Sequence, residues 1–324
     1  MLYKVSLANE CHFAAIFPGQ GSQYVGMGKF LYEKYQAARD IFNLANDTLN
    51  FSLSDLCFSG DIKELTKTCN AQPALLTVSY VMYQIYIKEK NLKPSILLGH
   101  SLGEITSLVC ADVISFSDGL MIARSRGTYM QECGDKNKGS MLAVFDDNFE
   151  LIKKFCDEIS NEKLILEVAN YNSNHQVVVS GSNEALDIFK EKLKKEGIKS
   201  ILLNVSAPFH SPVMKPAANS LYKKLIQYNY NSPFVPVIST VSGELYSAQD
   251  DIAKSLSLQV IKPVQWVQSI KNACELGIKL FIEVGPKNVL KNLNNDICKD
   301  IKALSLDVKE DLAEFYCIQG VNNE

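Results

Sequence analysis

Long hydrophobic runs are missing from this sequence. None of its 324 residues belongs to a stretch approaching the roughly 18–20 uncharged apolar residues that a transmembrane helix needs. The first dozen residues include Lys4 and Glu10 and offer no apolar core of signal-peptide length. We therefore expect a cytoplasmic protein with no membrane partner.

Paired cysteines and an excess of positive charge are also missing. The nine cysteines are scattered singly from Cys11 to Cys317, with no CxxC spacing, so neither a disulfide framework nor a zinc site is indicated. Reduced thiols are the expected state. The net charge of −3 argues against a general nucleic-acid binder.

Histidine is scarce, which leaves few candidates for any histidine-dependent chemistry. The sequence holds four, namely His12, His100, His175 and His210.

Four short apolar runs, two before residue 100 and two after residue 230, predict buried strands. Residues 13–18 end in proline before a glycine-rich loop, and residues 96–98 are followed by glycine and then by a helix start rich in small residues. Apolar positions recur at helical spacing over 71–88. Further buried strands are predicted at 235–238 and 280–284.

The middle of the chain reads as a separate β-α-β-β-α-β unit, the order of a ferredoxin-like fold. Its expected elements are a strand at 140–145, a helix at 148–159, strands at 164–170 and 176–180, a helix at 183–196 and a strand at 199–205. We predict an α/β protein with two parts. An α/β-hydrolase-like large subdomain with a parallel sheet (1–135 and 206–324) carries an inserted ferredoxin-like small subdomain (136–205).

The segment Gly99–Gly103 fits the pattern G-x-S-x-G between a predicted strand and a predicted helix. Such a turn lifts the oxygen of its serine, here Ser101, above the sheet edge. The N–H of Leu102, at the start of the helix, can face a developing oxyanion. The local alternative is a turn with only a structural role.

A nucleophilic serine needs a base. His100 is adjacent on a turn where neighbours point apart, so we expect it to pack against the turn or orient it. His12 lies outside the first strand, and His175 lies in a predicted hairpin turn. His210 follows the small subdomain in the segment 207–212, which two prolines stiffen. It is a plausible base, and the residues alone leave its role open.

Short blocks along the chain resemble, in order, those of the malonyl-CoA:acyl carrier protein transacylase family, which includes acyltransferases of polyketide synthases. The resemblance runs from about residue 13 to about residue 306. The blocks are Phe17–Gln23, Gln72–Leu76, Gly99–Glu104, Arg124–Gly127, Ala169–Asn172, Pro208–Ser211 and Glu283–Pro286.

The resemblance implies a ping-pong mechanism through an acyl-serine. Ser101 would be the nucleophile and His210 its base. The backbone carbonyl of Gln259 would orient the histidine, and the backbone N–H groups of Gln20 and Leu102 would form the oxyanion hole.

Arg126, 25 positions after Ser101, matches the family arginine that grips the free carboxylate of malonate. A planar guanidinium binds a carboxylate through two parallel bonds. The alternative is a surface arginine paired with a carboxylate of the chain. Gln72 is expected to shape the same pocket, and Asn170 and Asn172 to contribute contacts from the small subdomain.

Phe209 resembles malonyl-selective members, since methylmalonyl-selective ones often carry serine at that position. Its ring would occupy the space that a 2-methyl group needs, although it could equally be core packing. Two departures from the common pattern are Ile105, where an aromatic residue is usual, and a 12-residue N-terminal extension.

The implied activity moves a malonyl group from malonyl-CoA to the phosphopantetheine thiol of an acyl carrier protein, in fatty acid or polyketide synthesis. Neither metal nor redox cofactor is implied, because the coenzyme A thioester is an activated substrate. The alternatives are an acyl hydrolase acting on carrier proteins and a non-catalytic domain that docks on them.

Carrier proteins are typically acidic, so a basic patch near the cleft is expected. Its candidates are Lys190, Lys192, Lys194, Lys195, Lys287 and Lys291. No feature indicates an oligomeric state, and a monomer is the default expectation.

Overall fold

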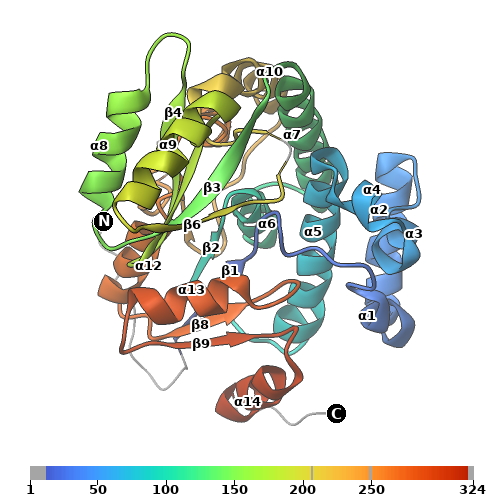
Figure 1. Ribbon diagram of the computed structural model, residues 1–324. Helices are drawn as coiled ribbons and strands as arrows, with labels where there is room; N and C mark the ends of the chain where they lie inside the picture. Colours follow the sequence, from blue (N-terminus) through green and yellow to red (C-terminus); the bar gives the residue numbers. More distant parts are fainter. Residues whose placement is uncertain (1–11, 206, 248–249, 320–324) are drawn as a thin grey trace.

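The computed structural model describes residues 12–205, 207–247 and 250–319 (Figure 1). Apart from His12, the N-terminal extension lies outside the described residues. The chain forms a five-stranded parallel sheet and a separate four-stranded antiparallel sheet. This is the α/β architecture expected from the sequence.

The parallel sheet is buried on both faces, as its continuous apolar strands predict. Its strand order is β7 (Val237–Ile238), β2 (Ile96–Gly99), β1 (Phe13–Phe17), β8 (Leu280–Glu283), β9 (Lys302–Ser305). Alternate side chains of β1 enter different cores. Phe13, Ala15 and Phe17 pack on one face, and Ala14 and Ile16 on the other.

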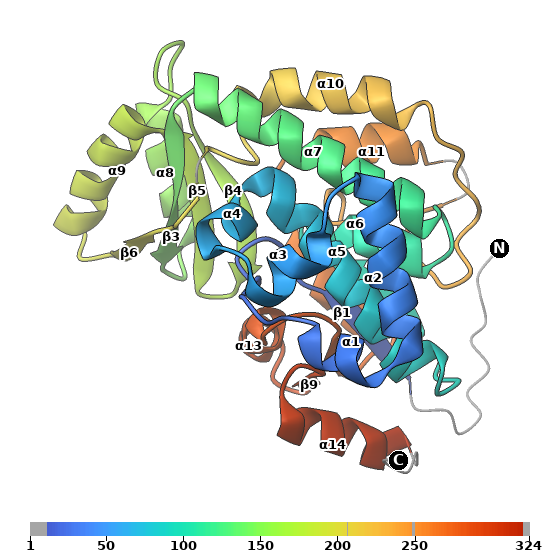
Figure 2. The ribbon, with the colours of Figure 1, turned by 90° about the vertical axis from the view of Figure 1, so that its right-hand side faces the viewer.

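Helices cover both faces of this sheet (Figures 1 and 2). Trp266 of α12 and Leu290 of α13 share the core of Ala14 and Ile16. Helices α5, α6, α7 and α14 contribute to the other core. The helices outside the small unit are α1 (Lys29–Lys34), α2 (Gln36–Leu49), α3 (Leu53–Ser59), α4 (Ile62–Thr66), α5 (Thr68–Tyr83), α6 (Leu102–Cys110), α7 (Phe116–Lys136), α10 (Lys215–Leu225), α11 (Ile252–Gln259), α12 (Trp266–Glu275), α13 (Val289–Ile297) and α14 (Lys309–Gln319).

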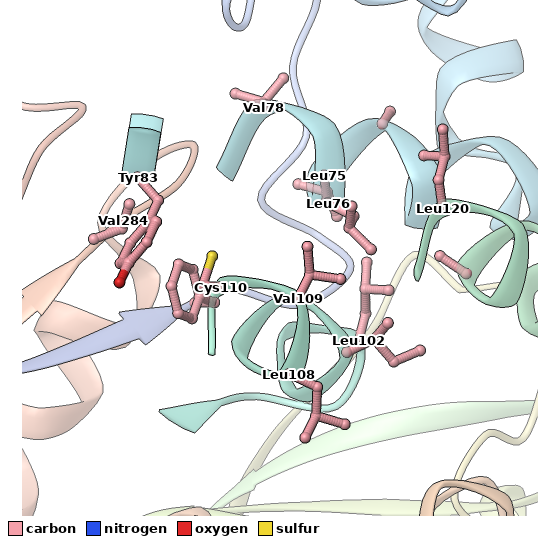
Figure 3. Packing of buried hydrophobic residues seen from close by; sticks show 14 of the residues in the cluster. Leu75, Leu76, Val78, Tyr83, Leu102, Leu108, Val109, Cys110, Leu120 and Val284 are labelled. Atoms are coloured by element: carbon pink, nitrogen blue, oxygen red, sulfur yellow. The ribbon is translucent and has the colours of Figure 1, made fainter. Parts of the chain in front are cut away.

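The helix that follows the Ser101 turn is held almost entirely inside the protein. Every residue of α6 is buried. Figure 3 shows Leu75 and Leu76 of α5 directed toward Leu102 and Val109 of α6. Close packing on α5 therefore fixes the helix whose first turn follows Ser101.

The small sheet has the order β4 (Leu166–Ser173), β5 (Gln176–Ser182), β3 (Gly139–Phe145), β6 (Lys199–Leu202), and all its pairs are antiparallel. Helices α8 (Phe149–Ile159) and α9 (Asn183–Lys195) pack on one face of it. All six elements follow the predicted order. The last strand ends at Leu202, earlier than expected, and β4 continues to Ser173.

The strand expected at 235–238 is shorter than predicted. Only Val237 and Ile238 form β7. Pro236 has no N–H to donate to a neighbouring strand, although its carbonyl accepts from Leu97. Helix α5 also ends earlier than the apolar spacing suggested, because a π-helical turn occupies Gln84–Lys88.

Backbone hydrogen bonds join β4 of the small sheet to the segment that precedes α12. The N–H of Tyr171 donates to the carbonyl of Val264 (3.0 Å), and the N–H of Val264 donates to that of Ala169 (2.9 Å). The side chain of Asn174 donates to the carbonyls of Asp296 and Ile297 at the end of α13. The small sheet is thus fastened next to α12 and α13.

The described cysteines are free thiols, and Cys11 lies outside the described residues. Cys274 and Cys298 bring their sulfur atoms to 3.6 Å. Within the described part of the chain, no helix is long and apolar enough to cross a membrane. The same residues contain no group of three or more His, Cys, Asp and Glu side chains placed to hold a metal ion.

Candidate active site

A cleft of about 480 Å³ lies between the small sheet and the end of the parallel sheet where Ser101 is placed. Met141, Ala143 and Phe145 of β3 line it. The residues between them, Leu142 and Val144, point instead to the core beneath α8 and α9. The face of the small sheet that its own helices leave uncovered therefore forms one wall.

Ser101 occupies a strained turn between β2 and α6. Its backbone has φ 52° and ψ −108°, a conformation that non-glycine residues rarely adopt. The flanking glycines are required because a side chain would not fit at either position. A Cβ at Gly99 would lie 2.0 Å from the carbonyl carbon of Gly103, and one at Gly103 would lie 2.1 Å from the carbonyl oxygen of Phe17. Packing against β1 thus explains the pattern seen in the sequence.

His210 stands between Ser101 and Gln259. Its Nε2 lies 2.9 Å from the Ser101 Oγ, and its Nδ1 lies 2.7 Å from the backbone carbonyl of Gln259. A carbonyl oxygen only accepts, so the Nδ1 carries the proton and the Nε2 accepts from the serine hydroxyl. The pair is arranged for proton transfer from a serine nucleophile.

Burial, followed by the positive charge of Arg126, lowers the pKa of His210 to about 3. The imidazole is therefore neutral across the physiological range, the form that can take a proton from Ser101.

Arg126 of α7 is 1% exposed, so it is not a surface arginine. Its Nη1 donates to Oε1 of Gln72 (2.9 Å), and its Nη2 donates to the Ser101 Oγ (3.0 Å) and to Oε1 of Gln259 (2.9 Å). Its buried Nε has no acceptor among the described residues. Burial lowers the pKa of Arg126 to about 10, which leaves the group positively charged at neutral pH. A cationic donor is thus available beside the Ser101 hydroxyl.

Other residues expected at the site border the cleft. Gln20 follows β1, and Leu102 begins α6 next to Ser101. The ring of Phe209 also lines the cleft and is 5% exposed. These positions suit contacts with a reacting group or its substituents.

Asn172 and Asn170 come from β4 of the small sheet and line the cleft too. The Oδ1 of Asn172 lies 2.9 Å from Nε2 of His100, whose ring packs beside that of Trp266. Asn170 pairs with Val264, in the segment before α12, in an isolated bridge. His100 therefore lines the cleft with its Nε2 bonded to Asn172, and it makes no side-chain hydrogen bond to Ser101.

The two remaining histidines take part in other contacts. His12 lies 3.1 Å from the hydroxyl of Ser95. His175, in the hairpin between β4 and β5, contacts Asp147 and Asp296.

Most of the lysines proposed for a basic patch lie elsewhere. Helix α9, with Lys190 and its neighbours, covers the face of the small sheet opposite the cleft (Figure 2). Lys291 is paired with Asp311 at 2.6 Å. Lys287 is the exception, because its Nζ donates to the carbonyl of Gly21, next to the loop of Gln20. The candidate lysines of α9 therefore lie away from the cleft, because the periodicity of a helix does not reveal which face of a sheet that helix covers.

The side chains of two polar residues at the site were not predicted from the sequence. Gln259 was expected to contribute only its backbone carbonyl, yet its side chain contacts Arg126. Glu104 was assigned no role, yet it is fully buried and accepts a hydrogen bond from Gln259. The sequence did contain a signal for Glu104, since a glutamate within an otherwise apolar, small-residue helix indicates a buried carboxylate that needs partners.

The strained serine turn between a strand and a helix, with His210 at hydrogen-bonding distance, forms a site at which a serine could accept an acyl group. The acyl transferase domain family matches residues 15–312, and the chain belongs to this family.

Its relatives include a malonyl CoA-acyl carrier protein transacylase of Bacillus subtilis strain 168, 40% identical over 92% of this chain and 94% of the relative. A solved structure of the malonyl CoA-acyl carrier protein transacylase from Coxiella burnetii has a TM-score of 0.92 at 34% identity, covering 97% of this chain and 99% of that one. Another, a malonyl-transacylase in complex with a type II polyketide synthase acyl-carrier protein, has a TM-score of 0.89 at 34% identity, covering 93% and 98%.

His210 should stay neutral in a titration that protonates an exposed histidine. In protein labelled with ¹⁵N-histidine and titrated from about pH 8 to about pH 5, we expect the Nδ1–H tautomer of His210 throughout. His175 provides the internal comparison, because hydrogen bonding to Asp147 and the charge of Asp296 raise its pKa. A His210→Gln variant assigns the signal. Protonation of His210 near the ordinary histidine pKa of about 6.5 would contradict the geometry.

Proposed function

We propose that this chain is a malonyl-CoA:acyl carrier protein S-malonyltransferase. The observation that carries the proposal is the buried guanidinium of Arg126, with an unpartnered N–H and a bond to the Ser101 Oγ. A buried, charged donor beside the cleft favours an acyl group that carries a free carboxylate. The similarity to malonyl transacylases along nearly the whole chain agrees with this substrate.

In the first half-reaction, the Ser101 Oγ attacks the thioester carbonyl of malonyl-CoA and His210 Nε2 takes the hydroxyl proton. The backbone N–H groups of Gln20 and Leu102 stabilise the tetrahedral oxyanion. Collapse breaks the carbon–sulfur bond, and His210 returns the proton to the departing coenzyme A sulfur. The product is a malonyl ester of Ser101.

In the second half-reaction, the phosphopantetheine thiol of the carrier protein gives its proton to His210 and attacks the ester carbonyl. Collapse of this second intermediate breaks the bond to Oγ, and the proton returns to Ser101. The backbone carbonyl of Gln259 holds the imidazole in the required tautomer throughout.

We also propose the division into a large α/β-hydrolase-like subdomain, 1–135 and 206–324, and a ferredoxin-like small subdomain, 136–205. The order β4-β5-β3-β6, with α8 and α9 on one face, supports the second part. The small subdomain would supply Asn170 and Asn172 to the substrate cleft. Gln72 would hold the guanidinium of Arg126.

The reaction needs no cofactor, because the coenzyme A thioester supplies the activated acyl group. We place it in the cytoplasm, in fatty acid or polyketide synthesis. Hydrolysis is the second candidate, since water could accept the acyl group from the same serine. A general hydrolase gains nothing from a carboxylate-binding arginine, and a purely docking domain gains nothing from an assembled serine–histidine pair.

The transfer is tested by intact-protein mass after brief mixing with malonyl-CoA, followed by a phosphopantetheinylated carrier protein. We expect a malonyl adduct that leaves this chain and appears on the carrier, and no adduct on Ser101→Ala. An adduct lost as free malonate would instead support the hydrolase.

Arg126→Ala should remove the preference for malonyl over acetyl groups, because the carboxylate loses its partner. We expect the ratio of kcat/KM values for malonyl-CoA and acetyl-CoA to fall at least about tenfold. Arg124→Ala is the matched control. Arg124 lies on the same helix, outside the cleft, and donates to the carbonyl of Cys69. An unchanged ratio in Arg126→Ala would refute the clamp.

Phe209→Ser should admit methylmalonyl groups, because the ring fills part of the cleft wall. One methyl group is worth about 1–3 kcal/mol, so we expect the methylmalonyl-to-malonyl ratio of kcat/KM to rise about tenfold. A parallel loss of both activities would show that Phe209 only packs the core.

A further inference from the structure

Glu104, in the first turn of α6, is a fully buried carboxylate surrounded by donors. Its Oε1 accepts from the hydroxyl of Tyr246 (2.5 Å). Its Oε2 accepts from the backbone N–H of Thr240 (3.1 Å), the hydroxyl of Thr240 (2.6 Å) and Nε2 of Gln259 (2.6 Å). All four of these bonds are donated to the carboxylate, so both of its oxygens have partners.

The side-chain amide of Gln259 lies between this carboxylate and Arg126. Its Nε2 donates to Glu104 and to the backbone carbonyl of Ser101 (3.0 Å), while its Oε1 accepts from Nη2 of Arg126 (2.9 Å). An amide nitrogen only donates and an amide oxygen only accepts. The carboxylate of Glu104 and the carbonyl of Ser101 therefore both hold the amide nitrogen away from the guanidinium, which leaves the amide oxygen facing Arg126.

Glu104 and Arg126 form no direct ion pair, yet the negative charge of Glu104 acts on Arg126 and opposes the effect of burial. A direct pair would occupy the guanidinium that the proposed function needs for a substrate carboxylate. An amide between the two charges stabilises the cation and leaves its Nε free. His210 is the other titratable group facing Arg126, and the charge of Arg126 lowers its pKa.

We propose that Glu104 is a positioning residue for malonyl selectivity, acting through the Gln259 amide to orient Arg126 and to compensate its buried charge. This proposal rests on the proposed function. The negative charge that compensates Arg126 would then come from a residue that does not line the cleft.

The test uses Glu104→Gln, which keeps the shape and an acceptor oxygen for Thr240 and Gln259 but removes the charge. The hydroxyl of Tyr246 can accept from the new amide. We expect kcat/KM for malonyl-CoA to fall about tenfold or more, while that for acetyl-CoA changes little. A loss of packing alone would lower both values together, which would overturn the proposal.

Tyr246→Phe is the matched control. It removes one hydrogen bond from the same carboxylate and leaves the charge in place. We expect a lower melting temperature with the malonyl-to-acetyl ratio unchanged. The same fall in the ratio for Tyr246→Phe as for Glu104→Gln would contradict a role for the charge.

A double-variant comparison separates this proposal from the clamp itself. In an Arg126→Ala background, Glu104→Gln should not lower the malonyl-to-acetyl ratio further, because its partner is gone. Additive losses would overturn the proposal.

If Glu104→Gln does not fold, Gln259→Met removes the same amide bridge from its other end and keeps the backbone carbonyl that contacts His210. It should lose the malonyl preference as well, and an unchanged preference would overturn the proposal.

The outcomes also separate the two proposals. A wild-type preference for malonyl that Arg126→Ala removes and Glu104→Gln leaves intact would refute only the role of Glu104. A wild-type protein with no preference for malonyl would refute the proposed function.

Discussion

Taking the guanidinium of Arg126 out of water costs free energy, and the cleft is arranged to offset that cost. Gln72, Gln259 and Ser101 accept its N–H groups, and Glu104 supplies opposing charge through one intervening amide. Residues of α5, α6, α7 and α11 must therefore meet at one point. The packing of α5 on α6 and the strained turn at Ser101 hold them there.

The charge of Arg126 also acts on His210. Burial and Arg126 together keep its imidazole unprotonated in the free protein, which is the form that the proposed base requires. A carboxylate bound to Arg126 would oppose the positive charge and raise the pKa of His210. Binding of a malonyl group would therefore make the base stronger at the moment it is required.

The parts of this site that lie within one short segment could be predicted from the sequence, because the residues of that segment determine their backbone conformation. A strand, two glycines and a small-residue helix specify the Ser101 turn, and the prolines around His210 indicate a fixed loop. The Glu104 network could not be found in this way. Its members, at positions 104, 240, 246 and 259, meet only after the sheet and α11 have packed. The cleft face of the small sheet was equally hidden, because alternation along β3 identifies two faces without saying which one helices α8 and α9 cover.

The position of β1 in the parallel sheet has a consequence for folding. This strand follows directly on the N-terminal segment, yet it is central, with β2 on one side and β8, which begins at Leu280, on the other. During synthesis β1 can pair with β2 early, but its second edge stays open until β8 has been made, more than 180 residues after β2. The antiparallel sheet, whose strands are close in sequence, has no such delay. In the cell, the open edge of β1 is therefore a part of the nascent chain that needs protection from wrong pairing.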